Sequence, residues 1–221
     1  MALPKNPKNE GVKRNLPPEG LEPARCFAII DIGTQVGMFE GKPKTPAREI
    51  MFFFELTNYS TVYKEGDMAL PYVMGQNYTY SLGDKAKLPN MLKQWFKQKD
   101  IKNYDNLPKI PGQYAMINVV HSKDGNYANI GSSGRGINPY MDAIPKPKKH
   151  YDTIYFEMPE VKKGEAFDWD LFKTFPMKAQ KAIRQSVEFK DILHKFPEPT
   201  SDNSTSQAES SSINDDDEVP F

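Results

Sequence analysis

The chain has 221 residues, 38% of them hydrophobic and 12% aromatic, and its 29 basic side chains balance its 29 acidic ones. This length predicts one domain with room for a helical appendage. A single cysteine excludes an internal disulfide framework, and no apolar run reaches the length of a membrane span. The first 24 residues are polar and basic without the apolar stretch of a signal peptide, so we expect a cytoplasmic location and no membrane partner.

Charge divides the chain into three segments. We expect a disordered basic leader over 1–24, a folded body over 25–196 and a disordered acidic tail over 197–221. The tail has seven acidic side chains and no Lys or Arg, so the preceding 196 residues carry 29 basic and 22 acidic side chains, a net charge of +7. A body that binds a polyanion, with a tail that competes for it, fits this asymmetry, and a solubilising tail on a basic domain fits it as well.

Three strands are predicted first in the body. Residues 25–33 (RCFAIIDIG), 48–56 (REIMFFFEL) and 72–82 (YVMGQNYTYSL) are compact apolar or alternating runs, and residues 37–46 between the first two form a Gly/Pro/Lys loop. In the third run, alternate residues from Tyr72 to Tyr80 share one face, and Gly75 indicates a bulge or a bend.

The pattern then changes to a helix and a hairpin. Residues 84–97 place Leu88, Met91, Leu92 and Trp95 on one helical face. Residues 113–121 and 126–131 form two more strands around the turn Lys123-Asp124-Gly125. Three strands, a helix and two strands are the order of an OB-fold, a five-stranded barrel with its helix between strands three and four.

The remainder of the body predicts an extension of this barrel. Residues 131–149 form a basic Gly/Pro loop, residues 151–158 an extended segment, and residues 168–196 one or two helices interrupted at Pro176. The expected fold class is therefore mainly β, an OB-fold with a C-terminal helical extension.

A sequence-tolerant binder of single strands needs Lys and Arg along a groove, with aromatic rings between them on which bases stack. We expect such a positively charged, ring-lined groove across the barrel. The candidate residues for it are Arg48, Phe53, Tyr72, Tyr78, Tyr80, Lys85, Lys87, Lys93, Lys97 and Arg135. Phe52, Phe54 and Trp95 are expected in the core, whereas the lysines could equally form a solvated helix face.

Signs of catalysis are sparse. The three histidines, His121, His150 and His194, lack metal-ligand spacing, and Cys26 lies mid-strand as a small buried hydrophobe. Residues 131–136 resemble a phosphate cradle but lack the Lys-Ser/Thr of a P-loop. Asp31 and Glu55 on neighbouring strands could form a carboxylate pair. We expect no enzyme activity, no metal and no cofactor.

The chain ends in four acidic residues followed by Val219, Pro220 and Phe221. This tip resembles the acidic C-terminal tip of bacterial single-stranded DNA-binding proteins, in which a run of Asp ends in Ile-Pro-Phe or a close variant. The resemblance implies that replication or recombination proteins bind the tail. The residues concerned are Asp215, Asp216, Asp217, Glu218, Pro220 and Phe221.

Residues 25–131 carry a longer resemblance. Residues 25–35 (RCFAIIDIGTQ) resemble the opening strand of a family of bacteriophage single-stranded DNA-binding proteins, and further matches follow in order at 53–56, 78–85, 92–95 and 118–130. The resemblance implies an OB-fold that coats single-stranded DNA during phage replication or recombination in the bacterial host cell. A homodimer is compatible with it.

Two other classes remain open. One is a protein-binding adaptor or structural component of a phage replisome or virion, without affinity for nucleic acid. The other is an OB-containing nuclease, which would need a carboxylate cluster that binds a divalent metal.

Overall fold

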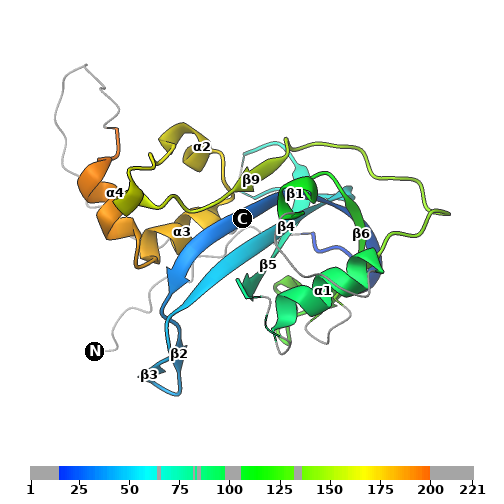
Figure 1. Cartoon of the computed structure of the whole chain (residues 1–221). Coiled ribbons are helices and arrows are strands. Elements are labelled where there is room, and N and C mark those ends of the chain that lie inside the picture. Colours follow the sequence, from blue (N-terminus) through cyan, green and yellow to red (C-terminus); the bar gives the residue numbers. More distant parts are fainter. Residues whose placement is uncertain are drawn as a thin grey trace, which may run out of the picture.

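A seven-stranded, largely antiparallel sheet forms the centre of the molecule (Figure 1). The computed structural model describes residues 15–63, 66–81, 83, 86–97, 106–131 and 136–199. The strands of the sheet are β1 (Gly20–Gln35), β4 (Ala47–Thr61), β5 (Leu70–Thr79), β6 (Tyr114–His121), β7 (Ala128–Ile130), β8 (Ile137–Pro139) and β9 (Ile154–Phe156). A separate hairpin joins β2 (Met38–Phe39) to β3 (Lys42–Pro43) within the segment predicted to be a loop.

Strand order in the sheet is β5-β4-β1-β6-β7, while β8 pairs with β6 and β9 pairs in parallel with β1. Strands β5 and β7 at the two ends lie next to each other. Among the described residues no ladder of strand pairing joins these ends, so the sheet is open there. The fold is therefore mainly β, as predicted.

Strand β1 extends further toward the N-terminus than predicted. Its residues Gly20–Arg25 pair with β6, and the backbone N–H of His121 donates to Glu19 Oε1. The predicted disordered leader over 1–24 is therefore wrong from residue 15 onward. The proline-rich composition of this segment predicted disorder. A strand forms nevertheless, because Pro23 is tolerated where its missing N–H costs no ladder bond.

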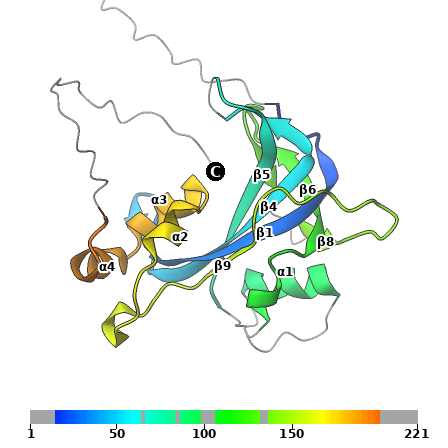
Figure 2. The same cartoon turned by 90° about the horizontal axis from the view of Figure 1, so that it is seen from above.

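The helices lie on both sides of the sheet (Figures 1 and 2). They are α1 (Lys87–Phe96), α2 (Trp169–Lys173), α3 (Met177–Gln185) and α4 (Phe189–Lys195), with short 3₁₀ turns η1 (Leu107–Lys109) and η2 (Val161–Lys163). The break at Pro176 occurs as predicted, and a second break at Ser186 makes three helices where one or two were expected. None of the helices in the described residues is long and apolar enough to cross a membrane.

Two hydrophobic cores occupy the two faces of the sheet. Phe52 and Phe54 of β4 point into the first core with Trp95 of α1, as predicted. Met51 and Phe53 point into the second, which β9 and α2–α4 cover. Because successive side chains of a strand alternate between faces, β4 is buried on both sides.

Gly75 provides space for one of these rings. A Cβ at residue 75 would lie 2.8 Å from Cε1 of Phe53, so only glycine fits opposite that ring. The register between β4 and β5 is continuous through the pair Phe53–Gly75. A bulge at Gly75 is therefore wrong, and close packing explains the glycine.

Candidate nucleic-acid interface

Two of the predicted stacking rings are in the core. Phe53 has no exposed surface and Tyr72 is 6% exposed. A ring stacks on a base only when one of its faces can be reached from solvent. Phe53 and Tyr72 therefore belong to the two cores, and their predicted role in binding is corrected: the C-terminal helices, which the sequence did not assign to this face, cover Phe53.

The other two predicted rings remain half-buried. Tyr78 packs edge-on against Phe52 with ring centroids 5.7 Å apart, and burial raises the pKa of its hydroxyl. Tyr80 lies at the end of β5, where the Arg48 guanidinium sits 5.5 Å from its ring centroid. The structure thus brings together Arg48 and Tyr80, two residues that the sequence predicted for the same site.

Arg48 is bound to a buried carboxylate. Its Nε donates to Oδ2 of Asp31 at 2.8 Å, and its Nη2 also bonds that oxygen. Asp31 is fully buried and accepts further hydrogen bonds from the backbone N–H groups of Gly33 and Met158. The hydrogen bond to Asp31 raises the pKa of Arg48, so this cation is already committed to a partner inside the protein.

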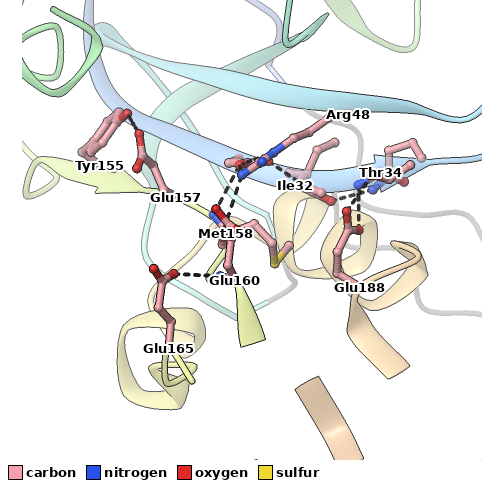
Figure 3. A network of polar contacts seen from close by, with 12 residues as sticks. Ile32, Thr34, Arg48, Tyr155, Glu157, Met158, Glu160, Glu165 and Glu188 are labelled. Atoms are coloured by element: carbon pink, nitrogen blue, oxygen red, sulfur yellow. Dashed lines mark hydrogen bonds and ion pairs between the residues drawn. The ribbon is translucent and has the colours of Figure 1, made fainter. Parts of the chain in front are cut away.

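A pocket of about 520 Å³ opens beside this ion pair. Its lining residues are Arg48, Tyr80, Glu157, Met158, Pro159, Glu160, Glu165 and Ala166. Figure 3 shows the lining glutamates on the same side of β1 as the Arg48 side chain. Glu157 accepts a hydrogen bond from the Tyr155 hydroxyl, Glu165 accepts one from the backbone N–H of Glu160, and Glu160 pairs with Lys163.

The charge of this pocket is unsuited to phosphate. Three carboxylates line it, and the one lining guanidinium is neutralised by Asp31. The carboxylates that line the pocket would repel a phosphate, because both are negatively charged. The Tyr80 ring, by contrast, offers a flat face to a neutral or cationic group. The predicted Arg48 is therefore better placed to hold the fold together than to bind a DNA backbone.

A second network beside the pocket fixes the helical segment to β1. Glu188 accepts hydrogen bonds from the Thr34 backbone N–H at 2.8 Å and from the Thr34 hydroxyl at 2.6 Å, as Figure 3 shows. Burial acts to raise the pKa of Glu188, but the hydrogen bonds from Thr34 outweigh it and that pKa lies below its usual value. The carboxylate form of Glu188 is thus the one that holds α4 against the sheet.

The predicted lysines of α1 lie away from this pocket. Lys87 and Lys97 are exposed and Lys93 is half-buried, and none of the three lines the pocket. Predicted residues Lys85 and Arg135 lie outside the described residues, as do the tail residues Asp215, Asp216, Asp217, Glu218, Pro220 and Phe221. The continuous track of charges and rings expected across the barrel is therefore not formed by the predicted residues that the structure describes.

Sequence reasoning missed one group of rings with a cation. Tyr114 and Tyr140 are half-buried, their ring centroids are 5.5 Å apart, and Lys146 Nζ lies 5.2 Å from the centroid of Tyr114. The available signal was the lysine-rich stretch after Tyr140, which was identified as a basic loop without its aromatic neighbours. Strand β8, which sets Tyr140 beside Tyr114, is too short to be predicted.

The residues considered for catalysis have structural roles. Burial raises the pKa of the Cys26 thiol, and this fully buried side chain is the small hydrophobe that was predicted. Asp31 and Glu55 do not meet as a carboxylate pair, because each bonds an arginine on the opposite strand. Within the described part of the chain, no three His, Cys, Asp or Glu side chains are placed to hold a metal ion.

Comparison of the chain with protein families, with curated proteins and with solved structures gives no match.

Proposed function

We propose that this chain is a single-stranded DNA-binding protein in which β1, β4, β5, β6 and β7 make the barrel of an OB-fold. The observation that carries the proposal is the strand order β5-β4-β1-β6-β7, with α1 in the connection between β5 and β6. This is the order of an OB-fold opened between its third and fifth strands, and β5 and β7 lie next to each other as closure requires.

Charge and sequence support the same proposal. The 196 residues before the tail have a net charge of +7, which suits a polyanionic ligand. The motifs at 25–35 and 118–130, which resemble those of phage single-stranded DNA-binding proteins, fall on β1 and on the β6–β7 hairpin. The protein would coat and protect single strands exposed during phage replication or recombination.

The acidic tail would then recruit replication or recombination enzymes. Its Phe221 ring suits an apolar pocket on a basic surface of a partner, and the acidic residues 215–218 would steer the encounter. Deletion of residues 215–221 should leave the affinity for DNA unchanged or raise it, since a tethered polyanion competes with the strand. A large loss of affinity would argue against this role.

Titration of the full chain with a fluorescent single-stranded oligonucleotide, with duplex and with RNA tests the proposal. We expect tight binding of the single strand, with log K falling against log salt with a slope of about −0.7 per phosphate contact. Equal or stronger binding of the duplex at low salt would contradict it.

One observation favours a protein-binding adaptor as the second candidate. Two of the four predicted stacking rings are buried, and the third, Tyr80, lines a pocket that also contains three carboxylates. An adaptor would show no affinity for any oligonucleotide in the same titration, so a single experiment separates the two functions.

A further inference from the structure

The surface around Tyr114, Tyr140 and Lys146 differs from the Arg48 pocket in its charge and its exposure. Tyr114 begins β6, and the antiparallel pairing of Ala115 with Pro139 brings Tyr114 opposite Tyr140 at the end of β8. The loop that follows folds back so that Lys146 Nζ lies 5.2 Å from the centroid of the Tyr114 ring. Two rings and a cation thus meet at one surface.

More cations follow in the same loop. Lys146, Lys148 and Lys149 are all exposed. The described partner of Lys149 is Asp152, whose side chain is 94% exposed, so that ion pair is in solvent and is weak. We call Tyr114, Tyr140, Lys146, Lys148 and Lys149 the basic–aromatic patch.

Both ends of the loop are fixed. The Tyr140 hydroxyl shares its one proton between the carbonyl oxygens of Ile144 and Pro145, which lie 3.1 and 2.8 Å away. At the other end, Glu55 accepts from the backbone N–H groups of His150 and Tyr151, at 3.1 and 3.0 Å. A loop held at both ends presents its lysines with little further loss of conformational entropy when a ligand binds.

A lysine of α1 extends the surface. Gln94 Nε2 donates to Asn138 Oδ1 at 2.8 Å, which places the Gln94 side of α1 against β8. Lys87 lies seven residues before Gln94 in the same helix, so helical periodicity puts it on that side. In Figures 1 and 2, α1 lies away from α2–α4.

We infer that the basic–aromatic patch is a contact surface for single-stranded nucleic acid. Bases would stack on Tyr140 and Tyr114, and the loop lysines would form ion pairs with phosphates. The inference rests on the proposed function and gives it a location. Interleaved rings and flexible cations are what sequence-tolerant binding of single strands needs. Among the described residues, the ion pair at these lysines joins Lys149 to the exposed Asp152, so the lysines can exchange solvent for phosphate.

Charge variants of the full chain test the phosphate contacts. Lys146→Ala/Lys148→Ala removes two cations from the patch, and Lys181→Ala/Lys190→Ala removes two exposed cations from α3 and α4. Each is titrated with a fluorescent oligothymidylate of about 16 nucleotides across a salt series. The patch variant should lose affinity and flatten the log–log salt slope by about 1.4, while the matched control keeps the wild-type slope.

Ring variants test the stacking. Tyr140→Leu should weaken binding about tenfold. Tyr140→Phe keeps the ring but loses the hydroxyl that bonds Ile144 and Pro145, so its affinity should lie between that of Tyr140→Leu and that of wild type. Circular dichroism and thermal unfolding establish that each variant is folded.

The outcomes separate the inference from the proposed function. Failure of the wild type to bind the oligonucleotide overturns both. Wild-type binding with unchanged affinity and slope in the patch variants overturns the location alone, and equal losses in the patch variant and the matched control do the same.

Discussion

The Arg48 pocket and the basic–aromatic patch contain the same pair of groups, a cation beside a tyrosine ring. Arg48 lies 5.5 Å from the Tyr80 ring centroid and Lys146 lies 5.2 Å from that of Tyr114. Their surroundings differ: fully buried Asp31 bonds Arg48 and three glutamates line the pocket, whereas Lys146 is exposed among other lysines. The residue pair is therefore a poor guide to function, and the carboxylates around it decide between a structural and a ligand-binding role.

Beside each region, an arginine–carboxylate pair joins β1 to β4. Asp31 of β1 bonds Arg48 of β4 beside the pocket, and Arg25 of β1 bonds Glu55 of β4 beneath the loop of the patch. Arg25 and Glu55 are both buried, whereas the Arg48 side chain is 44% exposed. Loss of a partner should consequently cost more at Glu55 than at Arg48.

The largest expected effect is that of Glu55→Ala. It leaves the buried Arg25 without its carboxylate and frees the His150 and Tyr151 N–H groups, so the free energy of unfolding should fall by about 3–5 kcal/mol. Chemical denaturation measures this. Asp152→Ala, which breaks the exposed pair with Lys149, is the control and should leave stability unchanged. A Glu55 variant as stable as wild type would show that the loop is not anchored there.

Arg48→Ala should be next, with a loss of about 1–3 kcal/mol in the free energy of unfolding. Buried Asp31 loses its charged partner and, within the described part of the chain, keeps two backbone N–H donors. Chemical denaturation measures this loss.

Lys146→Ala should leave stability as it is and reduce the salt slope of DNA binding by about 0.7. The comparison breaks if Arg48→Ala flattens the slope and Lys146→Ala does not.

Glu188 gives the pocket side a pH dependence. Its pKa is lower in the folded chain than its ordinary value of 4.5, so its stabilising contribution is present above that pH and is lost as pH falls through the folded pKa. Thermal unfolding between neutral and acidic pH should show a steeper loss of stability for wild type than for Glu188→Gln. Parallel curves would mean that the contact with Thr34 does not depend on charge.

The smallest effect is expected from Glu157→Gln/Glu165→Gln. Both amides can still accept the hydrogen bonds from Tyr155 and Glu160, so the fold should persist. Removal of two negative charges should raise the affinity for DNA only slightly and leave the salt slope unchanged. A rise above about tenfold, with a steeper slope, would place the strand in the pocket.

The strands β1, β4, β5, β6 and β7, the helix α1 and the first core followed from the sequence because their signals are local. Alternation from Phe52 to Phe54 and the helical spacing of Leu88 to Trp95 predicted the elements that carry the first core. The second core did not follow: Phe53 looked available because its cover, α2–α4, comes more than a hundred residues later in the chain. Arg48 looked available for the same reason, since its partner Asp31 is assigned only once β1 and β4 are in register. Long-range pairing is what the local patterns lack.

Hydrogen–deuterium exchange of the full chain with and without single-stranded oligonucleotide tests the central claim most directly, because it reads both regions at once. We predict that DNA slows exchange over residues 137–151, which carry β8 and the loop of the patch, and leaves residues 157–166 around the pocket unchanged. Protection at 157–166 without protection at 137–151, or no protection in either region, would contradict this account.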